Sequence, residues 1–194
     1  MSRKLILIKH ASPQVDPALP PEQWPLSEEG KAKCEALAKQ LAALSPGVVV
    51  CSEEMKAAET GRIVAERLGV PHGTAPDLHE HDRSNVPQLR SAEFISLIEL
   101  LFRRPNDLVL GKETAVAALS RFRSALDEVL AEHAEGNVAV VSHGTVIALL
   151  LEKLDPKRRG FEIWRAMKLP SFVVVGVPGM TVERVVNDIA AGAR

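Results

Sequence analysis

Two histidines stand close behind apolar runs that are typical of buried strands. His10 follows the run Leu5–Ile8 after one lysine, and His143 follows the run Val138–Val141 after one serine. A continuous apolar, β-branched run indicates a strand that is buried on both faces. Imidazole is nucleophilic near pH 7 and also forms strong hydrogen bonds, so such histidines could attack an electrophile or hold an anion.

The residues after His143 favour an anion as the ligand. The sequence Gly144-Thr145-Val146 is typical of a helix start. A helix start supplies free backbone N–H groups and the positive end of the helix dipole, and glycine lets the backbone approach a ligand. One histidine near a strand end is more often a hydrogen-bonded structural residue. Two histidines at corresponding positions favour a functional site.

The chain alternates strands with helices. We expect strands at 5–8, 48–50, 75–80, 138–141, 171–177 and 181–186, and helices at 28–45, 55–68, 92–102, 113–133 and 146–154. This alternation predicts an α/β layered fold with a mostly parallel sheet. Ligands of such sheets bind outside the carboxyl ends of the strands, where both histidines are expected.

Length, composition and charge indicate a single domain and argue against nucleic-acid and membrane partners. The chain has 194 residues, 46% of them hydrophobic, and a net charge of −1. We expect one domain over residues 1–187, with a cap segment at about 81–112, and a tail at 188–194. The charge argues against nucleic acid as a partner, and no apolar run reaches the ~20 residues that a membrane span needs.

The two cysteines, Cys34 and Cys51, do not make a disulfide framework, and the N-terminal apolar run is too short for a signal peptide. We therefore expect a cytoplasmic protein without membrane partners. The oligomeric state stays open, a homodimer included.

Six segments, in chain order, resemble the motifs of the histidine phosphatase (phosphoglycerate-mutase-like) superfamily. The first five are Leu5–Pro13 (against LIRHGET), Pro25–Gly30 (PLTxxG), Cys51–Thr60 (SSPLxRAxET), Leu78–Glu80 (LxE) and Val140–Ile147 (VVSHGxxI). Gly111–Glu113 weakly resembles GES, which begins the long helix. Each motif alone is short, but the ordered set spans most of the chain. The resemblance implies a three-layer sandwich with a small helical cap.

The resemblance also implies roles for the matching residues. His10 would attack phosphorus and form a phosphohistidine that water hydrolyses. His143, with Gly144, would donate hydrogen bonds to the oxygens of the transferred group. Glu80 would protonate the leaving oxygen and then activate water, and the negative phosphate beside it would tend to keep this carboxyl group protonated.

This sequence departs from the family pattern around His10. Lys9 and Lys56 replace two arginines, which keeps the charges but loses the planar fork that matches a phosphate edge. Ala11 replaces a glycine and places a methyl group where the backbone normally approaches phosphate. Asp16 stands where many members carry asparagine and adds a negative charge. Lys9, Ser12, Asp16, Lys56 and Gly144 are the phosphate-binding residues that we expect.

The sequence favours a phosphatase for small phosphomonoesters over a mutase. The segment between Glu80 and Glu113 is short and predicts one cap helix, whereas classical mutases of the superfamily carry longer insertions that enclose a bisphosphoglycerate cofactor. An open site favours water as the acceptor, and we expect no cofactor. Arg83, Asn85 and Arg90 are candidate contacts to the non-reacting end of the substrate, and each is at least as readily interpreted as a solvated loop residue. Trp24 is a candidate for the mouth of the pocket, although a Trp that packs its own loop is the commoner case.

Two rival interpretations remain open. The departures at Lys9, Ala11 and Lys56 also fit a degenerate member that binds phosphorylated ligands with little or no turnover. A metal-dependent hydrolase is the second rival, because a strand would point His79 and His81 to the same face. The spacing is not that of a recognised zinc motif, and we expect no metal.

Overall fold

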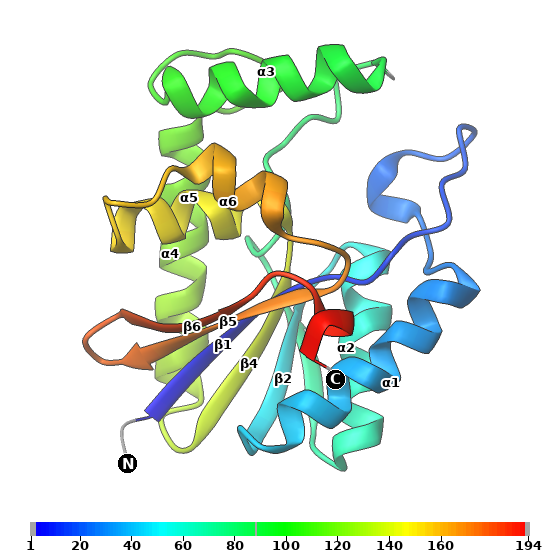
Figure 1. Ribbon diagram of the computed structural model, residues 1–194, viewed down its shortest axis with the longest axis vertical. Helices are drawn as coiled ribbons and strands as arrows, with labels where there is room; N and C mark the ends of the chain where they lie inside the picture. The colour runs from blue at the N-terminus through cyan, green and yellow to red at the C-terminus, as the bar shows by residue number, and fades with distance from the viewer. Residues whose placement is uncertain (1–2, 88, 193–194) are drawn as a thin grey trace.

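A six-stranded, mostly parallel sheet forms the centre of the molecule (Figure 1). The computed structural model describes residues 3–87 and 89–192. The strands are β1 (Arg3–Lys9), β2 (Pro46–Ser52), β3 (His72–Ala75), β4 (Asn137–Ser142), β5 (Ser171–Val177) and β6 (Thr181–Val186). Their order is β3-β2-β4-β1-β5-β6. The pairs from β3 to β1 are parallel, and β5 and β6 add an antiparallel edge. The predicted α/β class is confirmed.

Helices cover both faces of this sheet. The helices of the described residues are η1 (Pro21–Gln23), α1 (Glu28–Ala42), α2 (Met55–Leu68), α3 (Ser91–Arg103), α4 (Ala115–Glu132), α5 (Gly144–Leu154), α6 (Gly160–Ala166) and η2 (Ile189–Gly192). Figure 1 shows α1 and α2 on one face, α4 and α5 on the other, and α3 as a cap at the top. The expected three layers are therefore present. Within the described residues, none of the helices has the length and apolarity to cross a membrane.

The two central strands explain why both faces are apolar. Side chains alternate along β1, so Leu5 and Leu7 join the core under α4 and α5, while Ile6 and Ile8 join the core under α1 and α2. All four are fully buried. Such a strand appears in the sequence as an unbroken apolar run, which is why β1 and β4 could be predicted.

The register of β1 against β4 places the two histidines beside each other. Lys9 pairs with Ser142 at the end of this parallel ladder, and the N–H of His10 donates to the carbonyl of Ser142 at 3.0 Å. The next residue on each strand is a histidine. Two histidines that are 133 positions apart in the chain therefore meet at the carboxyl edge of the sheet.

Three segments differ from the sequence predictions. The third strand covers His72–Ala75 rather than 75–80, because the chain turns at Pro76-Asp77, where Asp77 has a positive φ. The short helix α6 was not predicted. Residues 188–194 were predicted to form a tail, yet Ile189 is buried and its carbonyl accepts a hydrogen bond from Gln40. Residues 193–194 lie outside the described part.

Candidate active site

His10 is held as a neutral ring with one free nitrogen. Its Nδ1 lies 2.8 Å from the carbonyl oxygen of Ala11. A carbonyl can only accept, so Nδ1 carries the hydrogen and Nε2 keeps its lone pair. Burial, followed by the nearby charges of His143, Lys56 and Lys9, holds the pKa of His10 well below its ordinary value, against the opposing effect of the Ala11 bond. The ring is therefore nucleophilic at neutral pH.

His143 lies against His10 and is fully buried. The two ring centroids are 5.1 Å apart, with the planes at 60°. His143 Nε2 is 3.0 Å from Ser52 Oγ and 3.5 Å from Glu54 Oε1, and among the described residues its Nδ1 has no hydrogen-bond partner. Burial lowers the pKa of His143 to about 4, although Glu54 and Glu80 oppose this. A neutral ring with an unpaired nitrogen can hydrogen-bond a ligand placed beside it.

Glu80 occupies the N-terminus of α5. Its Oε2 accepts from the N–H and the hydroxyl of Thr145, at 3.1 and 3.0 Å, and its Oε1 accepts from the N–H of Val146 at 3.3 Å. Arg83 Nη2 lies 3.3 Å from Oε2. The sequence predicts that this helix start binds an anion, and in the free protein the anion is the Glu80 carboxylate.

Burial by itself would raise the pKa of Glu80. The positive charge of Arg83, the nearby His143 and the N–H donors of His81 and Thr145 outweigh burial and hold this pKa well below its usual range. Glu80 is therefore ionised in the free protein. The sequence-based expectation of a protonated carboxyl group applies only when a phosphate lies beside it.

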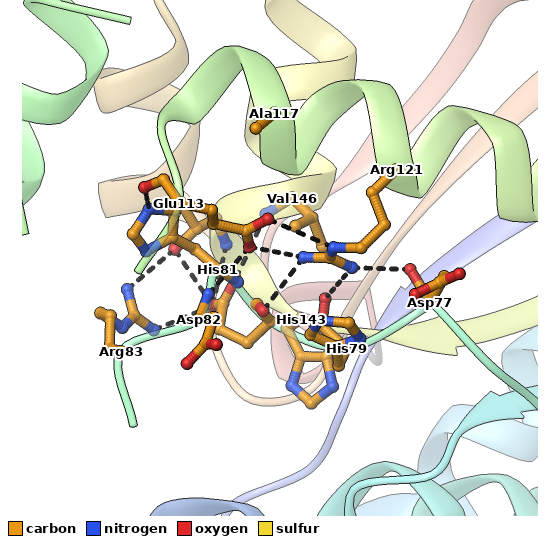
Figure 2. A network of polar contacts seen from close by, with 12 residues as sticks. Asp77, His79, His81, Asp82, Arg83, Glu113, Ala117, Arg121, His143 and Val146 are labelled. Carbon is orange, nitrogen blue, oxygen red and sulfur yellow. Dashed lines mark hydrogen bonds and ion pairs between the residues drawn. The ribbon is translucent and has the colours of Figure 1, made fainter. Parts of the chain in front are cut away.

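A buried ion pair fixes the segment that carries Glu80 (Figure 2). Arg121 of α4 pairs with Glu113 at 2.7 Å and donates to the carbonyls of Asp77, His79 and Glu80 at 2.7, 3.1 and 3.3 Å. Glu113 Oε1 in turn accepts from the N–H of Asp82 at 2.9 Å. We call Arg121 and Glu113 the clamp. The sequence suggested Glu113 only weakly, and Arg121 resembled an ordinary polar helix residue.

Lys56 is paired with a carboxylate that the sequence analysis missed. Its Nζ donates to Glu54 Oε2 and, at 2.8 Å, to the carbonyl of Pro21. Glu54 Oε1 also accepts from the N–H of Glu80 at 2.9 Å. An acidic residue just before a helix is usually a cap, so the position of Glu54 gave no signal. We call His10, Glu54, Lys56, Glu80 and His143 the strand-end cluster.

Lys9 and Gly144 pack against each other beside this cluster. Lys9 Nζ donates to the carbonyl of Met167 at 2.9 Å, and burial is the main cause that lowers the pKa of Lys9. A Cβ atom at Gly144 would lie 3.1 Å from Lys9 Cε and 3.5 Å from Trp164 Cδ1. Glycine at this position therefore leaves room for the lysine side chain.

The other predicted phosphate ligands have contacts of their own. Ser12 Oγ lies 3.4 Å from the carbonyl of Leu169. Asp16 holds its own loop, since Oδ1 accepts from the N–H of Ala18 and its carbonyl accepts from Trp24 Nε1. The methyl group of Ala11 is buried in the core under α1 and α2. These contacts hold Asp16 and Trp24 in the loop before α1.

The candidate substrate contacts of the cap segment have different partners. Arg83 reaches Glu80 and Thr145 and lies over the ring of Phe94. Asn85 donates to the carbonyl of Gly111 at 3.2 Å, and Arg90 is the exposed residue that precedes α3. Of these three side chains, Arg83 is therefore the one that touches the strand-end cluster.

The residues of the metal-hydrolase rival do not face each other. His81 is buried, and its Nε2 lies 2.8 Å from the carbonyl of Glu113, while His79 lies apart from it on the other side of the segment (Figure 2). No strand forms at these residues. In the described part of the chain, no three His, Cys, Asp or Glu side chains are grouped in a way that could hold a metal ion.

A cavity of about 990 Å³ lies next to the cluster rather than over it. Lys9 and Ser12 line it, together with α1, the segment 164–169 and η2, whereas His10 and His143 do not. The two histidines that could do phosphoryl chemistry therefore lie outside the lining of this cavity.

Comparison with known proteins decides the family. Residues 5–177 match the sequence model of the histidine phosphatase superfamily (branch 1). The chain belongs to this superfamily. A sequence comparison with curated proteins found no match.

Several solved structures, among them a phosphatase and a mutase, share the fold. YhfR of Bacillus stearothermophilus is 21% identical, with a TM-score of 0.75, over 95% of this chain and 96% of that one. A mycobacterial glucosyl-3-phosphoglycerate phosphatase is 21% identical (TM-score 0.71; 95% and 97% covered). A phosphoglycerate mutase of Bacillus anthracis is 18% identical (TM-score 0.71; 97% and 95% covered). Because a phosphatase and a mutase match equally well, the fold does not choose between the two activities.

Proposed function

We propose that the protein hydrolyses small phosphomonoesters through a phosphohistidine on His10. The observation that carries the proposal is the hydrogen bond from His10 Nδ1 to the Ala11 carbonyl, in a ring kept neutral by burial. It leaves the Nε2 lone pair as the nucleophile at the carboxyl end of β1. The family and the neighbouring His143 support the same role.

In the first step, Nε2 attacks phosphorus while the bond from phosphorus to the leaving oxygen breaks. A protonated Glu80 gives its proton to that oxygen. In the second step, water attacks phosphorus, the N–P bond breaks, and the Glu80 carboxylate takes the proton of the water. Proximity of a phosphate raises the carboxyl pKa, because two negative charges repel each other. When Nε2 of the neutral His143 ring accepts from the Ser52 hydroxyl, Nδ1 carries the hydrogen and is suited to donate to a phosphoryl oxygen.

Hydrolysis is favoured over mutase activity by the size of the cap. Between Glu80 and Glu113, α3 is the one helix in the described residues. A short cap leaves the phosphohistidine open to water, and water as the acceptor gives hydrolysis.

A second candidate function is binding of phosphorylated ligands with little turnover. It is favoured by one specific observation: Lys56 pairs with Glu54, and Lys9 donates to Met167, so both lysines that replace the family arginines have intramolecular partners. A cation that already has a partner stabilises an incoming phosphate less.

Trapping of the intermediate separates these functions. Wild type is mixed with p-nitrophenyl phosphate, quenched, and examined by intact mass for one added phosphoryl group, while nitrophenol release is followed in parallel. We expect turnover and an acid-labile adduct that are both lost in His10→Asn and retained in the control His79→Asn. Equal turnover in wild type and His10→Asn would overturn the proposal. Phosphate binding without adduct or turnover would support the second function.

A further inference from the structure

The strand-end cluster contains a buried carboxylate next to its lysine. Glu54 and Lys56 are 13% and 8% exposed, and their side chains form a direct ion pair. Burial would by itself raise the pKa of Glu54, but His143, Lys56 and the N–H of Glu80 lower it overall. Glu54 is therefore an anion at the place where the lysine would meet a phosphoryl group.

The same carboxylate reaches the histidine pair. Glu54 Oε1 lies 3.5 Å from His143 Nε2, and the His143 ring lies 5.1 Å from that of His10. A phosphoryl group on His10 would therefore lie in the same cluster of side chains as Glu54, with His143 in contact with both residues. In a partly buried site, the repulsion between two like charges is stronger than in bulk water, because the effective dielectric constant is lower.

The charges around the cluster are nearly balanced. Three cations, Lys9, Lys56 and Arg83, stand against two carboxylates, Glu54 and Glu80, and the pKa values of both histidines are lowered by burial. One net positive charge remains. A phosphomonoester carries close to two negative charges above its second pKa of about 6. This count holds for the free protein, in which Glu80 is ionised. A monoanion matches it as it stands, whereas a dianion is matched only after a proton has been added to Glu80 or to the ligand.

We propose that Glu54 sets the phosphoryl specificity of this site: it competes with dianionic phosphate for Lys56 and favours monoanionic phosphoryl groups, such as diesters or singly protonated monoesters. This rests on the proposed phosphoryl site at His10. The segment Cys51–Thr60 resembles the motif SSPLxRAxET, in which a leucine stands at the position of Glu54. The competing negative charge therefore distinguishes this chain from the family motif.

Calorimetric titration with two small anions tests the proposal. At pH 8, methyl phosphate is a dianion and dimethyl phosphate a monoanion. We expect Glu54→Gln to tighten methyl phosphate binding by about tenfold or more, because the repulsion is removed and Lys56 becomes free. Dimethyl phosphate should gain only about the square root of that factor, since Coulomb energy scales with ligand charge.

Glu53→Gln is the matched control, because Glu53 is the exposed neighbour and its change removes the same charge outside the cluster. It should leave both affinities unchanged. Glu54→Leu, which also removes the charge, is the second variant should Glu54→Gln fold poorly, and circular dichroism checks both. Unchanged or weaker methyl phosphate binding, or equal gains for the two anions, would overturn the proposal.

The titration does not depend on turnover, so the two proposals can fail separately. If the affinities shift as expected while His10 forms no adduct, the specificity proposal stands and the phosphatase proposal fails. If His10 is phosphorylated while Glu54→Gln leaves both affinities unchanged, the phosphatase proposal stands alone.

Discussion

The two sides of the strand-end cluster are built differently. On one side, Glu80 is fixed by Thr145 and Val146 of α5, by Arg83, and by the clamp that holds its backbone. On the other side, Lys56 is held by one carboxylate, Glu54, and one carbonyl, that of Pro21. The side that would transfer protons has many fixed contacts. The side that would bind phosphate depends on an ion pair that a ligand can exchange.

This difference indicates where the site is preorganised. Many converging hydrogen bonds hold a catalytic group in one geometry and cost nothing to reorganise during the reaction. A buried ion pair between two side chains contributes little net stability, because desolvation offsets the attraction. Variants on the Glu80 side should therefore have large effects, and variants of Lys56 that keep its charge should have small ones.

The largest effect is expected for Glu80→Gln. Loss of the general acid should lower kcat/KM, which reports the phosphoryl-transfer step, by about 10² to 10⁴ for an alkyl phosphate, and by less for p-nitrophenyl phosphate, whose leaving group needs no proton. Because Glu80 must be protonated while its free-protein pKa is held low, kcat/KM of wild type should fall as pH rises from 5 to 8. Steady-state rates with both esters check this, and equal losses for the two esters would contradict it.

Arg121→Met should lower the free energy of unfolding by about 3–5 kcal/mol, because it leaves Glu113 buried without its partner. It also frees the carbonyls that hold Glu80, so kcat should fall while KM stays close to the wild-type value. Urea unfolding and steady-state kinetics measure both. Arg123→Met, an exposed arginine on the same helix, is the control and should change neither. A stable Arg121→Met variant with normal kcat would show that the clamp does not position Glu80.

Stability should fall as pH drops from 7 to 5. The pKa of His143 is lowered from 6.5 to about 4, so in this range the unfolded chain binds a proton that the folded protein does not. Unfolding thus becomes more favourable, by about 2 kcal/mol from His143 alone, and His10 acts in the same direction. Urea unfolding at both pH values measures the slope. The loss of stability between pH 7 and pH 5 should be smaller in His143→Gln than in wild type, and should be unchanged in the control His79→Gln. An equal loss in wild type and both variants would refute this account.

The smallest effect is expected for Lys56→Arg. A guanidinium can contact Glu54 with one edge and a phosphoryl group with another, whereas an ammonium offers no such fork. We expect kcat/KM to rise about threefold for p-nitrophenyl phosphate, and Lys31→Arg on the surface of α1 to leave it unchanged. A loss of activity in Lys56→Arg would mean that the carbonyl of Pro21 and Glu54 require the narrower ammonium group.

Much of the fold could be predicted because its signals are local. Unbroken apolar runs gave β1 and β4, and the late pair β5 and β6 has the predicted bounds. The third strand was displaced, because turn chemistry at Pro76-Asp77 ends the extended segment. The helix α6 was missed because it has only seven residues, too few for a clear helical period.

The site was only partly predictable, because only some of its residues lie in segments that carry a local signal. His10, His143 and Glu80 lie in recognisable motifs, but Glu54 and Arg121 act through contacts with distant residues. Glu54 meets the N–H of Glu80 across 26 positions, and Arg121 meets the carbonyl of Asp77 across 44. No periodicity in one segment can report a contact that a second segment supplies.

The sequence by itself indicated that each histidine follows a buried strand of a mostly parallel sheet, because an unbroken apolar run precedes both. It also determined the family, through the order of short motifs. Only the tertiary structure decided which charges face those histidines. Folding brings Glu54 to His143 and to the N–H of Glu80, since partners that are far apart in the chain are chosen by distance in space and by burial.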